Sequence, residues 1–190
     1  MTINEALRPG VASSEMEAHL VEEMDLSLLD EPLEYVLADH SRQRSVCAML
    51  TRFSETHLAS RSEANRMIAF LTLDLRLHHL DEDEDLFPAL SRRLLPEDGL
   101  GAVLARLGED HRRSEEMIDT IVDMLAQHPA DDPVRLSTGA CQLMSAYTCA
   151  EHRHLAIENG VVLAIARIRL TRGDLRKISD GMKARRGVAC

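Results

Sequence analysis

Four long stretches of the chain repeat apolar residues at the spacing of an α-helix, and helix-breaking residues separate them. The stretches cover about residues 31–56, 61–93, 99–127 and 133–170. Two of the separating segments read LPEDG and HPADDP, in which proline, glycine and aspartate favour turns. No stretch shows the alternation of a half-buried β-strand. The sequence therefore predicts an all-α fold, an up-down-up-down four-helix bundle with short connections.

Helix starts and flanking segments complete this prediction. Ser60 and Glu63 have the spacing of a capping box, in which each side chain accepts a hydrogen bond from the other residue's backbone N–H. Asp30 and Asp132 each precede a proline closely, so we expect them to cap the first and fourth helices. The predicted organisation is an N-terminal arm (1–29), partly disordered or with a short helix near 14–24, then the bundle (30–172), then a short basic C-terminal helix and tail (173–190). The basic C-terminal residues either dock a partner or fold back onto the acidic body, and we favour folding back.

Composition excludes several classes of protein. The chain has 190 residues, 45% of them hydrophobic, which suffices for one domain with a core. A formal net charge of −10 argues against nucleic acid and anionic membrane as partners, because little would neutralise phosphates. No apolar run is long enough for a transmembrane helix, and the N-terminus lacks the features of a signal peptide. The four cysteines show no C-x-x-C spacing, so we expect free thiols in a cytoplasmic protein of undetermined oligomeric state.

Each helical stretch carries one histidine near its middle, on the stripe that is otherwise apolar. In three stretches a glutamate follows four residues later, which places imidazole and carboxylate on the same helix face, about 6 Å apart along the axis. The first stretch contributes a histidine alone, because Arg44 occupies the corresponding position. The seven residues that we expect to ligate metal are His40, His78, Glu82, His111, Glu115, His154 and Glu158.

A metal site is the simplest explanation of these seven side chains. Burying carboxylates without partners costs several kcal/mol each, and a cation compensates that cost. Mixed imidazole and carboxylate ligands suit iron, manganese or zinc. Seven ligands exceed what one tetrahedral zinc uses, so the pattern predicts two metals with bridging carboxylates.

A second pair on the same helix has the same spacing. His79 and Asp83 lie about 100° around the helix from His78 and Glu82. Choosing the second pair would turn the leucines of the stripe away from the core, so we favour the first. His79, Asp81 and most of their neighbours are then expected to face water.

The segments that carry these residues resemble the hemerythrin-like (HHE cation-binding) family. The matching text is ADHSRQRSVCAML, LRLHHLDEDEDLFPAL, GEDHRRSEEMI and EHRHLAIENGVVLAI, followed by DLRKISDGMKARRG, within about residues 30–186. The resemblance implies a four-helix bundle around two non-haem iron ions bridged by carboxylates, which react with dioxygen, nitric oxide or peroxide. By position, the family's ligands match His40, His78, Glu82, His111, His154 and Glu158, and Glu82 and Glu158 are the candidates for bridging.

Glu115 departs from the family's pattern. Oxygen-carrying members resemble this chain but have a second histidine at this position. An added carboxylate favours the ferric state, which argues against simple reversible oxygen carriage and for redox or oxygen sensing, or for peroxide chemistry.

Three functional classes follow from the sequence. The leading prediction is a cytoplasmic hemerythrin-like protein that binds or senses dioxygen or a related oxidant, rather than a dedicated enzyme. The second is a redox-responsive regulatory protein that acts through a protein partner, motivated by the segments at both ends. The third is a di-iron peroxide or nitric oxide reductase.

Three further side chains lie near the expected site. Cys47 and Tyr147 lie at the same level, beyond one side of it. Tyr147 either packs in the core, which we favour, or donates a hydrogen bond to a ligand, and a redox role for Cys47 is the less favoured alternative. Arg44 either neutralises the carboxylates or extends into solvent.

Overall fold

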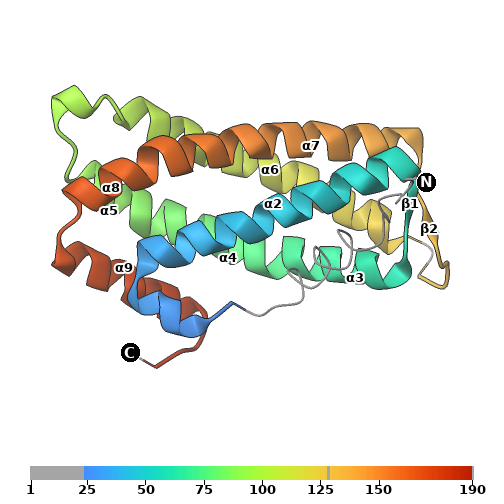
Figure 1. The fold of residues 1–190 in the computed structure, drawn as a ribbon, viewed down its shortest axis with the longest axis horizontal. Helices are drawn as coiled ribbons and strands as arrows, with labels where there is room; N and C mark the ends of the chain where they lie inside the picture. Colours follow the sequence, from blue (N-terminus) through green and yellow to red (C-terminus); the bar gives the residue numbers. More distant parts are fainter. Residues whose placement is uncertain (1–23, 128, 190) are drawn as a thin grey trace, which may run out of the picture.

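Four helical rods pack side by side in the computed structural model, which describes residues 24–127 and 129–189 (Figure 1). The first rod is α2 (Pro32–Thr56) and the third is α6 (Gly101–Ala126). The second rod runs through α3 (Arg61–Ala69), η2 (Phe70–Asp74), α4 (Leu75–Leu80), η3 (Asp81–Leu86) and α5 (Phe87–Ser91). The fourth runs through α7 (Thr138–Ile157), η5 (Glu158–Val162) and α8 (Leu163–Arg169). The predicted all-α bundle is confirmed.

Shorter elements connect and flank the rods. A 3-10 helix, η1 (Leu26–Asp30), precedes α2, and another, η4 (Pro96–Asp98), precedes α6. The strands β1 (Leu58–Ala59) and β2 (Val134–Arg135) pair antiparallel at one end of the bundle, although no strand was predicted. The C-terminal helix α9 (Arg172–Arg185) packs against η1 and η3 at the opposite end. The predicted N-terminal arm lies outside the described residues up to residue 23.

Two of the predicted helix caps are wrong, and one is confirmed. Ser60 and Glu63 form the expected capping box at α3. The fourth rod begins at Thr138, not near 133, because the Ser137 hydroxyl accepts the hydrogen bond from the Ala140 N–H while the preceding residues pair as β2. Asp132 instead accepts a hydrogen bond from the Arg61 backbone N–H. Asp30 does not cap α2; its carboxylate pairs with Lys183 of α9.

The segments η2, η3 and η5 are π-helical, which the sequence did not indicate. A π-helical turn holds an extra residue, so it changes which following residues face the core. In a regular α-helix continued from Glu158, Val161 and Ile165 would share its inward face. In the structure Val162 and Ala166 are fully buried instead, and Val161 is 40% exposed. The inward face is shifted by one residue because the π-helical η5 holds one extra residue.

Two apolar clusters fill the bundle on either side of a polar layer. One cluster includes Phe53, Met67 and Leu125 near the paired strands, and the other includes Leu33 and Leu90 near α9. Burying each such side chain contributes roughly 1.5–3 kcal/mol, which offsets the cost of the polar layer between them. No helix in the described part of the chain is both long and apolar enough to cross a membrane.

The C-terminal helix folds back onto the acidic segment of the second rod, as favoured from the sequence. Arg185 Nε lies 2.8 Å from Asp81 Oδ1, and Arg186 Nη2 lies 2.6 Å from Asp81 Oδ2. Arg186 also donates a hydrogen bond to the Tyr35 hydroxyl at 3.0 Å. Asp81 was expected to face water, but it is 1% exposed because these arginines cover it.

Candidate metal centre

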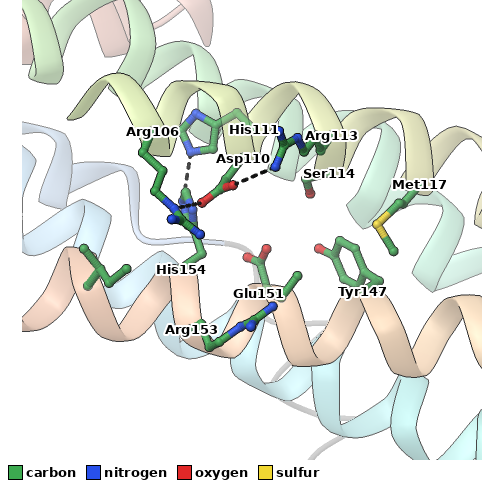
Figure 2. A pocket seen from close by; sticks show the side chains of 12 residues that line it. Arg106, Asp110, His111, Arg113, Ser114, Met117, Tyr147, Glu151, Arg153 and His154 are labelled. Carbon is green, nitrogen blue, oxygen red and sulfur yellow. Dashed lines mark hydrogen bonds and ion pairs between the residues drawn. The ribbon is translucent and has the colours of Figure 1, made fainter. Parts of the chain in front are cut away.

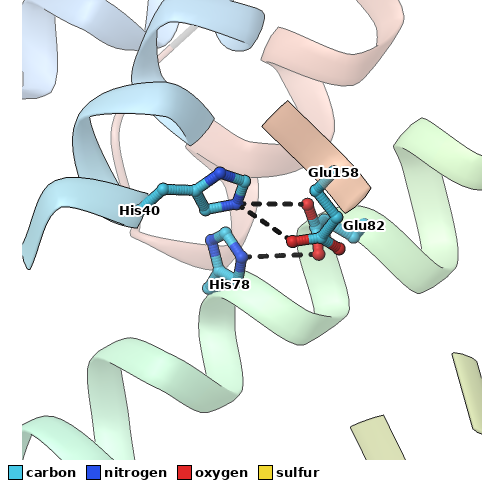
Figure 3. A group of neighbouring side chains, drawn as sticks. All are labelled: His40, His78, Glu82 and Glu158. Atoms are coloured by element: carbon cyan, nitrogen blue, oxygen red, sulfur yellow. Dashed lines mark ion pairs between the residues drawn. The ribbon is translucent and has the colours of Figure 1, made fainter. Parts of the chain in front are cut away.

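Six side chains from all four rods meet between the two apolar clusters, and none is more than 7% exposed. Their ligand atoms form two groups, and within each group these atoms lie within 4.8 Å of one another. The first group is His40, His78, Glu82 and Glu158, and the second is Glu82, His111, His154 and Glu158. Figure 3 shows the first group, with both imidazoles facing both carboxylates. We call these six residues the His/Glu cluster.

The carboxylates of Glu82 and Glu158 belong to both groups. Glu158 Oε2 lies 3.3 Å from His40 Nε2, while its Oε1 lies 2.8 Å from His154 Nε2. One carboxylate therefore presents one oxygen to each group, as a bridging ligand does. Glu82 Oε2 lies 3.4 Å from His78 Nε2 and 3.3 Å from His111 Nε2, so it also reaches both.

Outer partners orient three of the imidazoles. His40 Nδ1 lies 3.0 Å from Asn159 Oδ1, and His111 Nδ1 lies 3.0 Å from Asp83 Oδ1. His78 Nδ1 lies 3.2 Å from Asp39 Oδ2. When Nδ1 donates its proton to such an oxygen, the lone pair of Nε2 points into the cluster, which is the arrangement found at metal-bound histidines.

Buried polar atoms without hydrogen-bond partners concentrate in the cluster. They include Nε2 of His40 and His78 and all four carboxylate oxygens of Glu82 and Glu158, which contact imidazole nitrogens of the cluster at 2.8–3.7 Å without the geometry of a hydrogen bond. Each such atom costs roughly 1–3 kcal/mol when it stays unsatisfied. A cation between the imidazoles and carboxylates would satisfy all of them, and a nitrogen and oxygen donor set of this kind suits iron. The residues present therefore fit a metal.

Comparison with protein-family models agrees with this geometry. The model described as the hemerythrin HHE cation binding domain matches residues 31–166, which include the whole His/Glu cluster. The chain belongs to the hemerythrin HHE family. A search of curated protein sequences finds no match. Membership of the family, together with the His/Glu cluster, supports an iron-binding protein.

In the hemerythrin HHE domain, the pKa values of the two shared carboxyl groups, Glu82 and Glu158, are shifted in opposite directions. Burial and the charge of Glu82 raise the pKa of Glu158 well above its ordinary value. Burial also opposes ionisation of Glu82, but His78 and His111 outweigh it and hold the pKa of Glu82 well below its ordinary value. Burial disfavours the charged form of His111, yet Asp83 and Glu82 raise its pKa to about 10. Binding of a cation would displace protons from such groups.

Glu115, predicted as the seventh ligand, joins neither group. Its side chain is 44% exposed, and its carboxylate lies 3.4 Å from His79 Nδ1. Glu82 lies in the π-helical η3 and Glu158 begins the π-helical η5, whereas α6 is regular α-helix through Glu115. The His/Glu cluster therefore holds four histidines and two glutamates. Glu115 does not supply the third carboxylate that was expected to make the centre easier to oxidise.

His79 and Asp83 have roles that the sequence did not predict. His79 was expected in water, but it is 3% exposed and stacks on His111 with ring centroids 4.2 Å apart. Burial lowers the pKa of His79 to about 4, so this imidazole is neutral at pH 7. Asp83 contacts His111 and is no alternative to Glu82 in either group.

Other polar residues near the cluster do not lie on the inward stripes that the sequence predicts, so the sequence did not point to them. Asp39 binds both His78 and the buried Arg42, whose Nη1 lies 3.0 Å from Asp39 Oδ1. Arg44, by contrast, is exposed and extends into solvent. Burial raises the pKa of the Cys47 thiol, so it stays protonated, which weakens the case for a redox role.

A pocket of about 270 Å³ lies between α6 and α7 and reaches the second group of the hemerythrin HHE domain (Figure 2). His111 and His154 line it, together with Tyr147 and Glu151. Tyr147 is 2% exposed and Glu151 is 5% exposed. Glu151 was missed in the sequence, although it lies four residues after Tyr147 and three before His154, on the same helix face.

Proposed function

We propose that this hemerythrin HHE protein holds two non-haem iron ions and binds or senses dioxygen or a related small oxidant, such as peroxide or nitric oxide. The proposed ligands are the six residues of the His/Glu cluster: His40, His78, Glu82, His111, His154 and Glu158. The observation that carries the proposal is that Glu82 and Glu158 belong to both ligand groups, and that their buried oxygens face the imidazoles of these groups without making a hydrogen bond. The family match supports iron as the metal.

The residues divide into two positions with four ligands each. His40 and His78 complete the first position, and His111 and His154 complete the second. The iron pair would supply electrons and an open coordination site for a small molecule. The protein orients the imidazoles through Asn159, Asp39 and Asp83, and the apolar clusters above and below keep bulk water away.

Metal analysis tests the two-iron proposal. The purified protein, reconstituted anaerobically with ferrous iron and desalted, is expected to retain two equivalents. Glu158→Ala removes a ligand of both positions and is expected to lose most of the iron. Glu115→Ala is the matched control, because Glu115 lies outside both groups. A single equivalent in the wild type, or equal losses in both variants, would contradict the proposed ligand set.

Exposure of the reduced protein to air separates the functional classes. A stable optical adduct that reverses under vacuum supports carriage, and a single oxidation without turnover supports sensing. Repeated turnover with peroxide or nitric oxide supports a reductase.

A second candidate is a redox-responsive regulatory protein of the cytoplasm that acts through a protein partner. The observation that favours it is the contact of Arg185 and Arg186 with Asp81, the residue next to Glu82. A change at Glu82 would reach α9 through one peptide unit and one ion pair. Hydrogen exchange of α9, compared between the reduced and oxidised iron protein, tests this candidate, and equal exchange in both states would argue against it.

A further inference from the structure

The pocket between α6 and α7 contains a polar group that the His/Glu cluster does not use. Glu151 is 5% exposed, and its Oε1 has no hydrogen-bond partner. Figure 2 shows its carboxylate pointing into the space between the two helices, toward the hydroxyl of Tyr147. A buried carboxyl oxygen without a partner destabilises the fold, so the position of Glu151 Oε1 indicates a polar ligand in the pocket.

The walls of the pocket combine polar and apolar character. The Ser114 hydroxyl lines it from α6, opposite Glu151 of α7. Met117 and Ile157 supply apolar surface. Its volume of about 270 Å³ is many times the roughly 30 Å³ that one water occupies in the liquid. The pocket therefore has room for a small organic molecule with one polar end.

This chemistry discriminates among the oxidants of the proposed function. Dioxygen and nitric oxide are small and almost apolar, so neither would satisfy a buried carboxyl group. A hydroperoxide has an O–H donor and acceptor oxygens at one end and a substituent at the other.

We infer that the pocket binds a hydroperoxide, either hydrogen peroxide or a small organic one. Glu151 positions its O–O–H group by hydrogen bonding beside His111 and His154, and the apolar wall receives the substituent. The inference rests on the proposed function, because the oxidising power of the ligand is used only if the iron pair is present. If it is bound and reduced, the iron pair would supply the two electrons that break the O–O bond, and solvent would supply two protons. An organic hydroperoxide would then give its alcohol and one water, and hydrogen peroxide would give two waters.

Oxidation kinetics of the reduced iron protein test the inference. Stopped-flow rates are measured with hydrogen peroxide, tert-butyl hydroperoxide and dioxygen. Glu151→Leu is expected to slow oxidation by one or both hydroperoxides by about tenfold or more, as the loss of a hydrogen bond predicts, and oxidation by dioxygen by less than about twofold. Glu151→Gln keeps hydrogen-bonding capacity and is expected to recover part of the rate. Glu116→Leu, at an exposed position of α6, is the control and is expected to change neither rate.

Binding without redox chemistry gives a second readout. Zinc is redox-inert, so the zinc-loaded protein can be titrated with tert-butyl hydroperoxide and followed by ligand-observed NMR. Line broadening in the wild type that is lost in Glu151→Leu supports the inference. No broadening in the wild type, combined with unchanged hydrogen peroxide kinetics in Glu151→Leu, overturns it.

Three other outcomes would overturn either the hydroperoxide inference or the proposed function. An equal slowing of hydroperoxide and dioxygen oxidation in Glu151→Leu overturns the inference, because Glu151 would then act on the centre as a whole. Loss of iron in this variant overturns it as well, since Glu151 would be a ligand. Failure of the wild type to hold two iron equivalents contradicts the proposed function alone, because the NMR titration of the protein without iron still reports on the pocket.

Discussion

Replacing Glu158 by glutamine is expected to change the stability of the protein in opposite directions with and without metal. Glu158 is fully buried, and one of its carboxylate oxygens lies within 4.8 Å of a carboxylate oxygen of Glu82. At that separation two unit charges repel by about 3.5 kcal/mol at an effective dielectric constant of about 20. Proton uptake by Glu158, whose pKa is raised by burial and by Glu82, relieves part of this repulsion. We therefore expect Glu158→Gln to raise the free energy of unfolding of the metal-free protein by about 1–3 kcal/mol at pH 7.

The metal-loaded protein is expected to show the reverse. A ligand at 100 times its dissociation constant stabilises the native state by about 2.7 kcal/mol per site. A neutral amide is a poor substitute for a carboxylate that serves both positions, so the variant should lose most of this gain.

Equilibrium urea unfolding measures both effects, with chelator and with ferrous iron under anaerobic conditions. Glu116→Gln, at an exposed position of α6, is the matched control and should shift neither curve. The reasoning is refuted if metal-free Glu158→Gln is less stable than the metal-free wild type, or if ferrous iron stabilises the variant as much as the wild type.

Three further predictions concern the surroundings of the cluster. Asp83→Asn removes the carboxylate that orients His111, so iron affinity at the second position should fall about 10–100-fold with the helical circular dichroism unchanged; equal affinity would contradict the orienting role. Because the pKa of His111 is raised to about 10, this imidazole is protonated at pH 7 and must lose its proton to bind iron. Iron affinity should therefore fall by at least about tenfold for each pH unit below 10, and calorimetry in buffers of different ionisation enthalpy should detect the released protons. Replacing both Arg185 and Arg186 by alanine removes the two arginines that hold the buried Asp81, which should cost about 3–5 kcal/mol in urea unfolding; adding Asp81→Asn should recover part of that loss, and no recovery would show that the arginines act through other contacts.

The sequence by itself was sufficient for the bundle and for most of the cluster. The helical period of the apolar residues places one histidine per rod on the inward stripe, and a glutamate four residues later shares that face. Four rods that each carry such a residue near mid-length bring them together as soon as the rods pack. The family resemblance was likewise readable from the segments around His40, His78 and His154.

Only the tertiary structure decided which side chains complete the site. Periodicity gives the angle and height of a residue on its own helix, but not the rotation of that helix against its neighbours or the partners that distant segments bring. Glu115 has the same spacing as Glu82 and Glu158, yet it stays at the edge of α6 beside His79. Asp81 is buried only because Arg185 and Arg186, more than 100 residues later, cover it. Glu151 gains its pocket in the same way, because the space that its carboxyl group faces exists only between α6 and α7 once both helices have packed.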